Sequence, residues 1–150
     1  MDEKLQKVVK MFSYPVWFVI RDNKVDCTCT KFHTKQADFN CKKCLGTGKK
    51  IKLVRENAAH QNDSLAQRGE GMGYGEQMVV GEYYSLRPVN AKVEDIIVDK
   101  NDVDVIQRIY PERTNHNSPV YYRFTTSPMK EYSEVFLKNF KELLEKFGYG

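Results

Sequence analysis

The sequence has little that would place it in a membrane or an oxidising compartment. Its longest apolar run, Val16–Ile20, is far shorter than the roughly 20 residues that a helix needs to cross a bilayer. The N-terminus has no basic segment followed by an apolar one, so we expect neither a signal peptide nor a membrane span. The chain has only 4 cysteines, and a reducing cytoplasm would leave their thiols free to bind a metal.

Motifs for catalysis and nucleotide binding are also lacking. Between residues 69 and 75 glycine occurs at every second position, but the Gly-Lys-Ser/Thr of a phosphate-binding loop does not follow. The acidic turn at residues 99–104 lacks the glycine and final glutamate of a calcium loop. The histidines lie in polar stretches away from a recognisable nucleophile, which favours surface positions for His33, His60 and His116. We therefore expect a protein that is not an enzyme.

The composition indicates one soluble, folded domain. Hydrophobic residues make up 41% and charged residues 29% of the 150 residues, which is typical of a globular protein with a modest core. The net charge of +4 is uneven: residues 1–60 carry 13 Lys and Arg against 6 Asp and Glu, whereas residues 61–150 carry 11 against 14. The basic half also holds all the cysteines, so its lysines can balance a negatively charged metal–thiolate cluster.

The cysteines form two close pairs. Cys27 and Cys29 are separated by one residue, Cys41 and Cys44 by two, and a short spacer joins the pairs. Two such knuckles are typical of a structural zinc site, because each places two sulfurs on one side of a tight turn. Four thiolates complete a tetrahedral Zn²⁺, so the sequence predicts a metal that holds the chain together and does no chemistry.

The residues around the second pair fit this interpretation. Gly46 and Gly48 follow Cys44 where the chain must turn back, so we expect positive φ angles there and backbone N–H groups that point at the metal-bound sulfurs. Lys42 and Lys43 add positive charge beside the thiolates and are candidates for contact with a partner. Three glycines of the following loop are also candidates for contact with a partner, namely Gly71, Gly73 and Gly75.

Three alternatives for the cysteines remain open at this stage. His33 could replace one cysteine as a ligand. Cys41 and Cys44 have the spacing of a redox pair, although they lack the strand-to-helix context that such pairs use. An iron–sulfur cluster also takes four thiolates.

The hydrophobic pattern predicts an α+β protein, with a small antiparallel β-barrel or sheet, a zinc-ribbon-like module and a long C-terminal amphipathic helix. Apolar spacing favours a helix over residues 2–12, and the pattern of residues 13–29 predicts a hairpin with its turn at Asp22-Asn23. Short strands then recur from residue 78, with a turn at residues 99–102. Ser127 and Pro128 resemble the start of the last helix, and Gly148 resembles its end.

We expect four regions in one compact domain. They are an N-terminal segment with the zinc module (1–56), a glycine-rich loop (57–77), the β-barrel or sheet (78–126) and the C-terminal helix (127–150).

Two stretches resemble known families. "CKKCLGTG" resembles the Cys-x-x-Cys-x-Gly-x-Gly unit of the DnaJ-type chaperone zinc domain, which implies a shared knuckle geometry and no chaperone function. The cysteine module with "QADFNC", followed by "VEDIIVDKNDVDVIQRIYPERTNHNSPVYYRF", is similar to head-closure and connector proteins of the tailed-bacteriophage neck. Together these segments cover about residues 25–126, and the C-terminal helix has no place in that pattern.

The neck resemblance implies a small barrel whose loops dock onto neighbouring subunits in a ring. It implies a virion protein, assembled in the host cytoplasm, with portal, neck or tail subunits as partners, a homo-oligomeric ring, contact with packaged DNA and no membrane. The alternative function is a zinc-ribbon module that binds nucleic acid. It is favoured by the basic first half and by aromatic residues that could stack on bases, namely Tyr14, Trp17, Phe18, Phe32 and Phe39.

Overall fold

The computed structural model describes residues 2–29, 40–62, 81–113, 119–129 and 132–147. In these ranges the chain is an α+β protein with a closed, six-stranded antiparallel barrel and two helices. The predicted α+β class is therefore confirmed, and of the two predicted arrangements, barrel or sheet, the structure has the barrel. Within the described ranges no helix has the length and apolar character to span a membrane.

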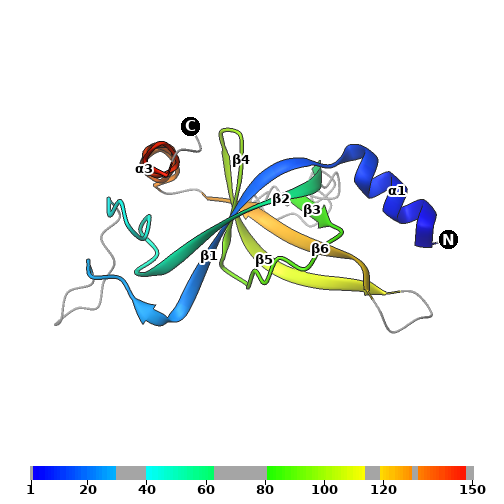
Figure 1. The fold of residues 1–150 in the computed structure, drawn as a ribbon, viewed down its shortest axis with the longest axis horizontal. Helices are drawn as coiled ribbons and strands as arrows, with labels where there is room; N and C mark the ends of the chain where they lie inside the picture. The colour runs from blue at the N-terminus through cyan, green and yellow to red at the C-terminus, as the bar shows by residue number, and fades with distance from the viewer. Residues whose placement is uncertain (1, 30–39, 63–80, 114–118, 130–131, 148–150) are drawn as a thin grey trace, which may run out of the picture.

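The strands close the barrel in the order β1-β2-β3-β6-β5-β4, and β4 pairs with β1. In chain order the elements are α1 (Asp2–Phe12), β1 (Tyr14–Asp26), β2 (Lys49–Asn62), β3 (Gly81–Ser85), β4 (Ile96–Asp99), β5 (Asp102–Arg113), β6 (Pro119–Pro128) and α3 (Ser133–Lys146). Figure 1 shows α1 and α3 on opposite sides of the barrel, with α3 on the same side as the segment of residues 40–48 that enters β2.

The barrel uses more of the N-terminal half than the sequence indicated. The predicted hairpin at Asp22-Asn23 is wrong, because β1 is one long strand that pairs with β2 from Tyr14 to Asp22 and again at Asp26. Its register shifts between Asp22 and Asp26, so the turn-forming residues are accommodated as an irregularity within the strand. β1 also pairs with β4, so the most hydrophobic part of β1 has a partner on both edges.

β2 also extends beyond its predicted end. Residues 57–62, which were assigned to the glycine-rich loop, belong to β2 and pair partly with β1 and partly with β3. The rest of that predicted loop, residues 63–77 with Gly71, Gly73 and Gly75, lies outside the described residues.

Two hydrophobic clusters lie on the two faces of the barrel wall. The interior cluster includes Phe18, Ile97 and Phe124, all almost completely buried. The outer cluster lies beneath α3 and contains Val19 and Phe140 together with other residues of β1, β4 and the helix. Because successive strand residues face opposite sides, Phe18 and Val19 belong to different clusters.

The C-terminal helix is shorter than predicted. Ser127 and Pro128 end β6, where they pair with Val105 and Asp104, and α3 begins only at Ser133. Ser127 and Pro128 could have started a helix, but they pair in the sheet instead. A proline is tolerated at the end of a strand, because no backbone N–H is needed there for a hydrogen bond to the next strand. The predicted helix stop, Gly148, lies outside the described residues.

Candidate metal centre

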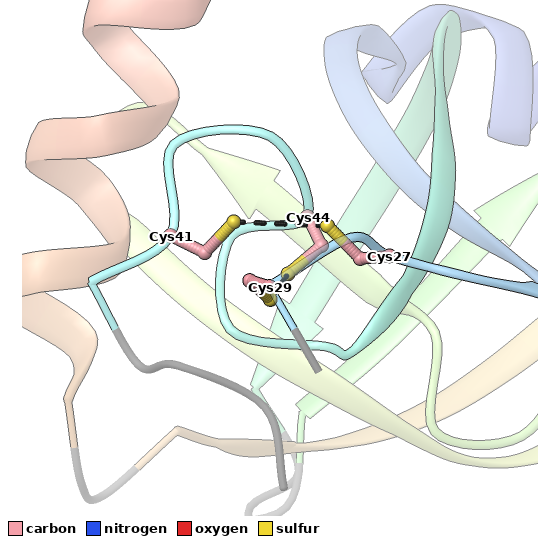
Figure 2. A group of neighbouring side chains, drawn as sticks. All are labelled: Cys27, Cys29, Cys41 and Cys44. Atoms are coloured by element: carbon pink, nitrogen blue, oxygen red, sulfur yellow. Dashed lines mark hydrogen bonds between the residues drawn. The ribbon is translucent and has the colours of Figure 1, made fainter. Parts of the chain in front are cut away.

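The four cysteines converge beside α3. Cys27 and Cys29 follow the end of β1, whereas Cys41 and Cys44 lie in the loop that enters β2, and Figure 2 shows the two pairs facing each other. All four Sγ atoms lie within 4.8 Å of one another. The Sγ atoms of Cys27 and Cys41 are 3.7 Å apart, and those of Cys29 and Cys44 are 3.4 Å apart. Residues from both predicted knuckles thus form one cluster.

This arrangement fits a metal ion. With metal–sulfur bonds of about 2.3 Å, two thiolates of a tetrahedral zinc site lie about 3.8 Å apart. The measured separations are close to this value, and all four cysteines are free thiols. The cluster could therefore hold a metal ion.

The loop after Cys41 folds as the glycine spacing predicts. Gly46 and Gly48 have φ angles of 86° and 76°, conformations that side chains with a Cβ resist. The Gly48 N–H donates to Cys44 Sγ at 3.4 Å, and the Gly48 carbonyl accepts from Cys27 N at 2.9 Å. One glycine thus ties the two cysteine pairs together, and its N–H stabilises negative charge on the sulfur.

Burial and backbone N–H groups change the thiol pKa values of Cys41 and Cys44 in opposite directions. Burial opposes ionisation of Cys41, but hydrogen bonds from the backbone of Cys44 and Lys43 outweigh it and lower the pKa of this thiol to about 7. Burial raises the pKa of Cys44 to about 12, although N–H groups of Gly48 and Gly46 counteract it. A cation among the sulfurs would remove the cost of a buried thiolate at Cys44.

The cysteine loop is also attached to the last helix. Asn139 Nδ2, on a side chain that is almost fully buried, donates to Asn40 Oδ1 at 3.1 Å. Lys42 Nζ lies 3.1 Å from Glu142 Oε2. Leu45, 3% exposed, packs in the outer cluster with residues of α3. A metal at the cysteines would therefore also help to position α3.

The attachment of α3 can be tested at Asn139. We expect Asn139→Ala to lower the free energy of unfolding by about 1–2 kcal/mol, because it removes a buried hydrogen bond and leaves a small void. Urea unfolding measures the effect. The control is Lys138→Ala, an exposed neighbour on the same helix, which should change stability by less than about 0.5 kcal/mol. Equal effects of the two changes would contradict the attachment.

The other predicted site residues have mixed outcomes. Lys42 is largely exposed next to Glu142, and Lys43 is exposed beside it, so both are accessible to a partner. His33, weighed as a substitute ligand, and the three loop glycines lie outside the described residues.

Sequence reasoning missed a polar network inside one end of the barrel. Asp99 lies at the start of the predicted acidic turn, but it is 4% exposed and accepts a hydrogen bond from the Tyr14 hydroxyl. The Tyr83 hydroxyl lies 3.0 Å from Asp104 Oδ2 and 3.3 Å from Asp99 Oδ2. His60, expected on the surface, stacks on Tyr83 with 4.3 Å between ring centres. Strand alternation could have indicated this burial. Asp99 follows the buried Ile97 by two residues in β4, and residues two apart in a strand face the same side.

The network predicts an unusual dependence of stability on pH. Burial raises the pKa of Asp104, even though the Tyr83 hydroxyl lowers it. The folded protein therefore disfavours the ionised carboxyl: the contribution of Asp104 to stability is most favourable below its ordinary pKa near 3.8 and is lost as the pH rises through the raised folded value.

We expect Asp104→Asn to stabilise the protein at neutral pH, because the amide is uncharged and can still accept from Tyr83. The advantage should shrink below about pH 3.8, where the wild-type carboxyl is protonated in both states. Denaturant unfolding at several pH values measures it. Asp102→Asn, at an exposed position two residues earlier, is the control. A gain that persists unchanged at acidic pH would contradict the assignment to ionisation.

Comparison with models of known protein families and with curated proteins gives no match for this chain. Its class is therefore defined by the fold and the site: a small closed barrel flanked by two described helices, with a four-cysteine cluster that could hold a metal ion. What the protein does must be argued from its residues.

Proposed function

We propose that this protein is a non-enzymatic structural subunit whose four cysteines bind one zinc ion, and that it works in the head-to-tail connector of a tailed bacteriophage. The observation that carries the zinc part is the single cluster of four sulfur atoms within 4.8 Å. The phage setting depends on the resemblance of the cysteine module and later strands to neck proteins. The closed barrel that contains those strands supports it.

Zinc is favoured by the donor atoms. A set of four cysteine sulfurs selects soft or borderline metals over magnesium and calcium, which prefer oxygen. Zinc binds four such ligands in tetrahedral geometry, because its filled d shell imposes no other coordination geometry. When bound, it supplies a crosslink between the end of β1 and the start of β2.

A structural role follows from the completeness of the donor set. Catalytic zinc sites keep one position for water or substrate, whereas four cysteines occupy every tetrahedral position. Three contacts join the cluster's loop to the outer core and to α3, at Asn40, Lys42 and Leu45. The metal would thus stabilise a surface that is built from several elements.

In the connector, this surface would contact other virion subunits. A ring of identical subunits needs two different faces on each copy, because the contact is head-to-tail. The partners would be the portal, neck or tail subunits next to the ring, and basic residues could also face packaged DNA.

The nucleic-acid alternative loses part of its support. Of the aromatic residues considered for base stacking, Phe18 is fully buried inside the barrel. Trp17 lies edge-on against Phe140 and has the guanidinium of Arg55 over its ring. These rings are engaged within the protein, and stacking on bases needs an accessible face.

Three measurements test the proposal. Metal analysis with thiol titration should find one zinc per chain and four thiols that become reactive only after chelation. Metal-free protein with four reactive thiols would contradict the zinc site.

Non-denaturing mass spectrometry should find a closed oligomer. A chain that stays monomeric at all concentrations and with candidate neck partners would contradict the connector role. A steep negative dependence of DNA affinity on log salt would favour the nucleic-acid alternative.

A further inference from the structure

A groove of about 700 Å³ lies between the cysteine loop, the outer face of β2 and α3. Three lysines line it: Lys42 and Lys43 from the cysteine loop and Lys146 from the last turn of α3. Its apolar lining includes Ile51 and Leu53 of β2. Figure 2 shows α3 beside the loop that carries Cys41, and residues of both the loop and the helix line the groove.

The apolar part of the groove is continuous with the outer core. Ile51, Leu53 and Leu143 pack against that core but are only partly buried. Phe147, which directly follows α3, lines the groove and is 60% exposed. The groove therefore offers apolar surface that a buried side chain of another molecule could cover.

The charge of the groove is positive. Glu142 is the one carboxylate among the lining residues, all of which lie in the described part of the chain, and it lies 3.1 Å from Lys42. Lys43 and Lys146 add two further positive charges. An apolar surface bordered by lysines is complementary to a segment that carries carboxylates around one or more apolar side chains.

We propose that this groove binds an acidic, amphipathic segment of a partner protein. The segment's apolar side chains cover Leu143 and Phe147, and its Asp or Glu carboxylates face Lys43 and Lys146. The volume exceeds what one side chain fills and lies within the usual range for a specific binding site. Because the apolar part of the lining is mostly aliphatic, a protein segment fits it better than nucleic acid, which uses aromatic platforms for its bases.

The proposal rests on the proposed zinc site in one respect. Lys42 and Lys43 lie between Cys41 and Cys44, so a bound metal fixes the loop that carries one side of the groove. Removal of the metal frees this loop and separates its lysines from Lys146 on α3. Binding of the acidic segment should therefore be lost when the metal is removed.

The test is a selection of short random peptides, displayed on ribosomes, against the zinc-loaded full-length protein. We expect the selected peptides to be enriched in Asp and Glu around large apolar residues. Lys43→Glu and Lys146→Glu should each weaken the best peptide by about tenfold or more, because attraction becomes repulsion. The controls Lys52→Glu and Lys138→Glu reverse exposed lysines on β2 and α3 that do not line the groove, and they should leave the affinity unchanged.

The outcomes separate this inference from the proposed function. Zinc-loaded protein that selects no acidic peptides, or peptides that bind Lys43→Glu and Lys146→Glu as well as the wild type, would overturn the groove proposal and leave the zinc site intact. Self-association that either groove variant abolishes would assign the groove to a second copy of the chain and would also overturn it. Acidic peptides that bind equally well after chelation would support the groove and refute only its dependence on the metal.

Discussion

Replacing Cys44 with serine is expected to lower zinc affinity by more than about a hundredfold, a larger loss than changes outside the ligand set typically cause. Cys44 is fully buried, and its sulfur accepts the Gly48 N–H. A serine hydroxyl is a poor zinc ligand, so three sulfurs would remain. Competition with a chromophoric chelator measures the affinity.

The same change should also destabilise the fold. A metal at a thousand times its dissociation constant adds about 4 kcal/mol to the free energy of unfolding, and the variant would lose most of this. Leu45 and the attachment to α3 would loosen with the loop, whereas the barrel should stay folded. Thr28→Ser, at an exposed position between Cys27 and Cys29, is the matched control and should retain both metal and stability. Wild-type stability that is indifferent to chelation would contradict a structural role for the metal.

Asp95→Ala is expected to cost about 3–5 kcal/mol of stability, because it removes the buried half of an ion pair and leaves Arg21 only its longer contact with the exposed Glu94. Asp95 is fully buried. Its Oδ1 accepts from both the backbone N and the Nε of Arg21 at 3.1 Å, and its Oδ2 accepts from Lys92 N at 2.8 Å. Its backbone also pairs with Ile106 of β5. Asp95 thus holds the segment before β4 against β1 through its carboxylate and against β5 through its backbone carbonyl.

Urea unfolding of Asp95→Ala measures this cost. Glu94→Ala is the matched control: Glu94 is the adjacent residue and also pairs with Arg21, at 3.6 Å, but its side chain is 73% exposed. Exposed ion pairs contribute little to stability, so we expect Glu94→Ala to change the free energy of unfolding by less than about 1 kcal/mol. If both variants lost the same amount of stability, Asp95 would not have the role assigned to it.

Features that depend on neighbouring residues could be predicted from the sequence. Helix α1 has the predicted bounds, and the turn between Asp99 and Asp102 joins β4 and β5 as a hairpin. The cysteines lie together, and Gly46 and Gly48 have the expected positive φ angles. In each case the signal lies within a few residues of the feature, so local geometry is sufficient to specify it.

Features that depend on distant partners were predicted less well. Closure of the barrel requires β1 to pair with β4, and a local turn signal at Asp22-Asn23 gave the wrong hairpin instead. Likewise, pairing with β5 placed Ser127 and Pro128 in β6 and shortened the last helix. Tertiary contacts override local preferences of this kind.

The polar network illustrates the same limit at a finer scale. Asp99 looks like a turn residue in the sequence, because the turn is adjacent, whereas Tyr14 and Tyr83 reach it from β1 and β3. The partners become visible only after the barrel closes. Buried polar groups of this type usually have hydrogen-bond partners, but the sequence does not indicate which residues provide them.

X-ray absorption at the zinc edge of the purified, full-length protein tests the central claim most directly, because it reports the atoms bound to the metal. The account predicts one zinc per chain with four sulfur neighbours at about 2.3 Å and no nitrogen or oxygen in the first shell. A shell that contains nitrogen or oxygen would indicate an open site or a histidine ligand and would contradict a closed four-cysteine centre. Protein without bound zinc would contradict the account altogether.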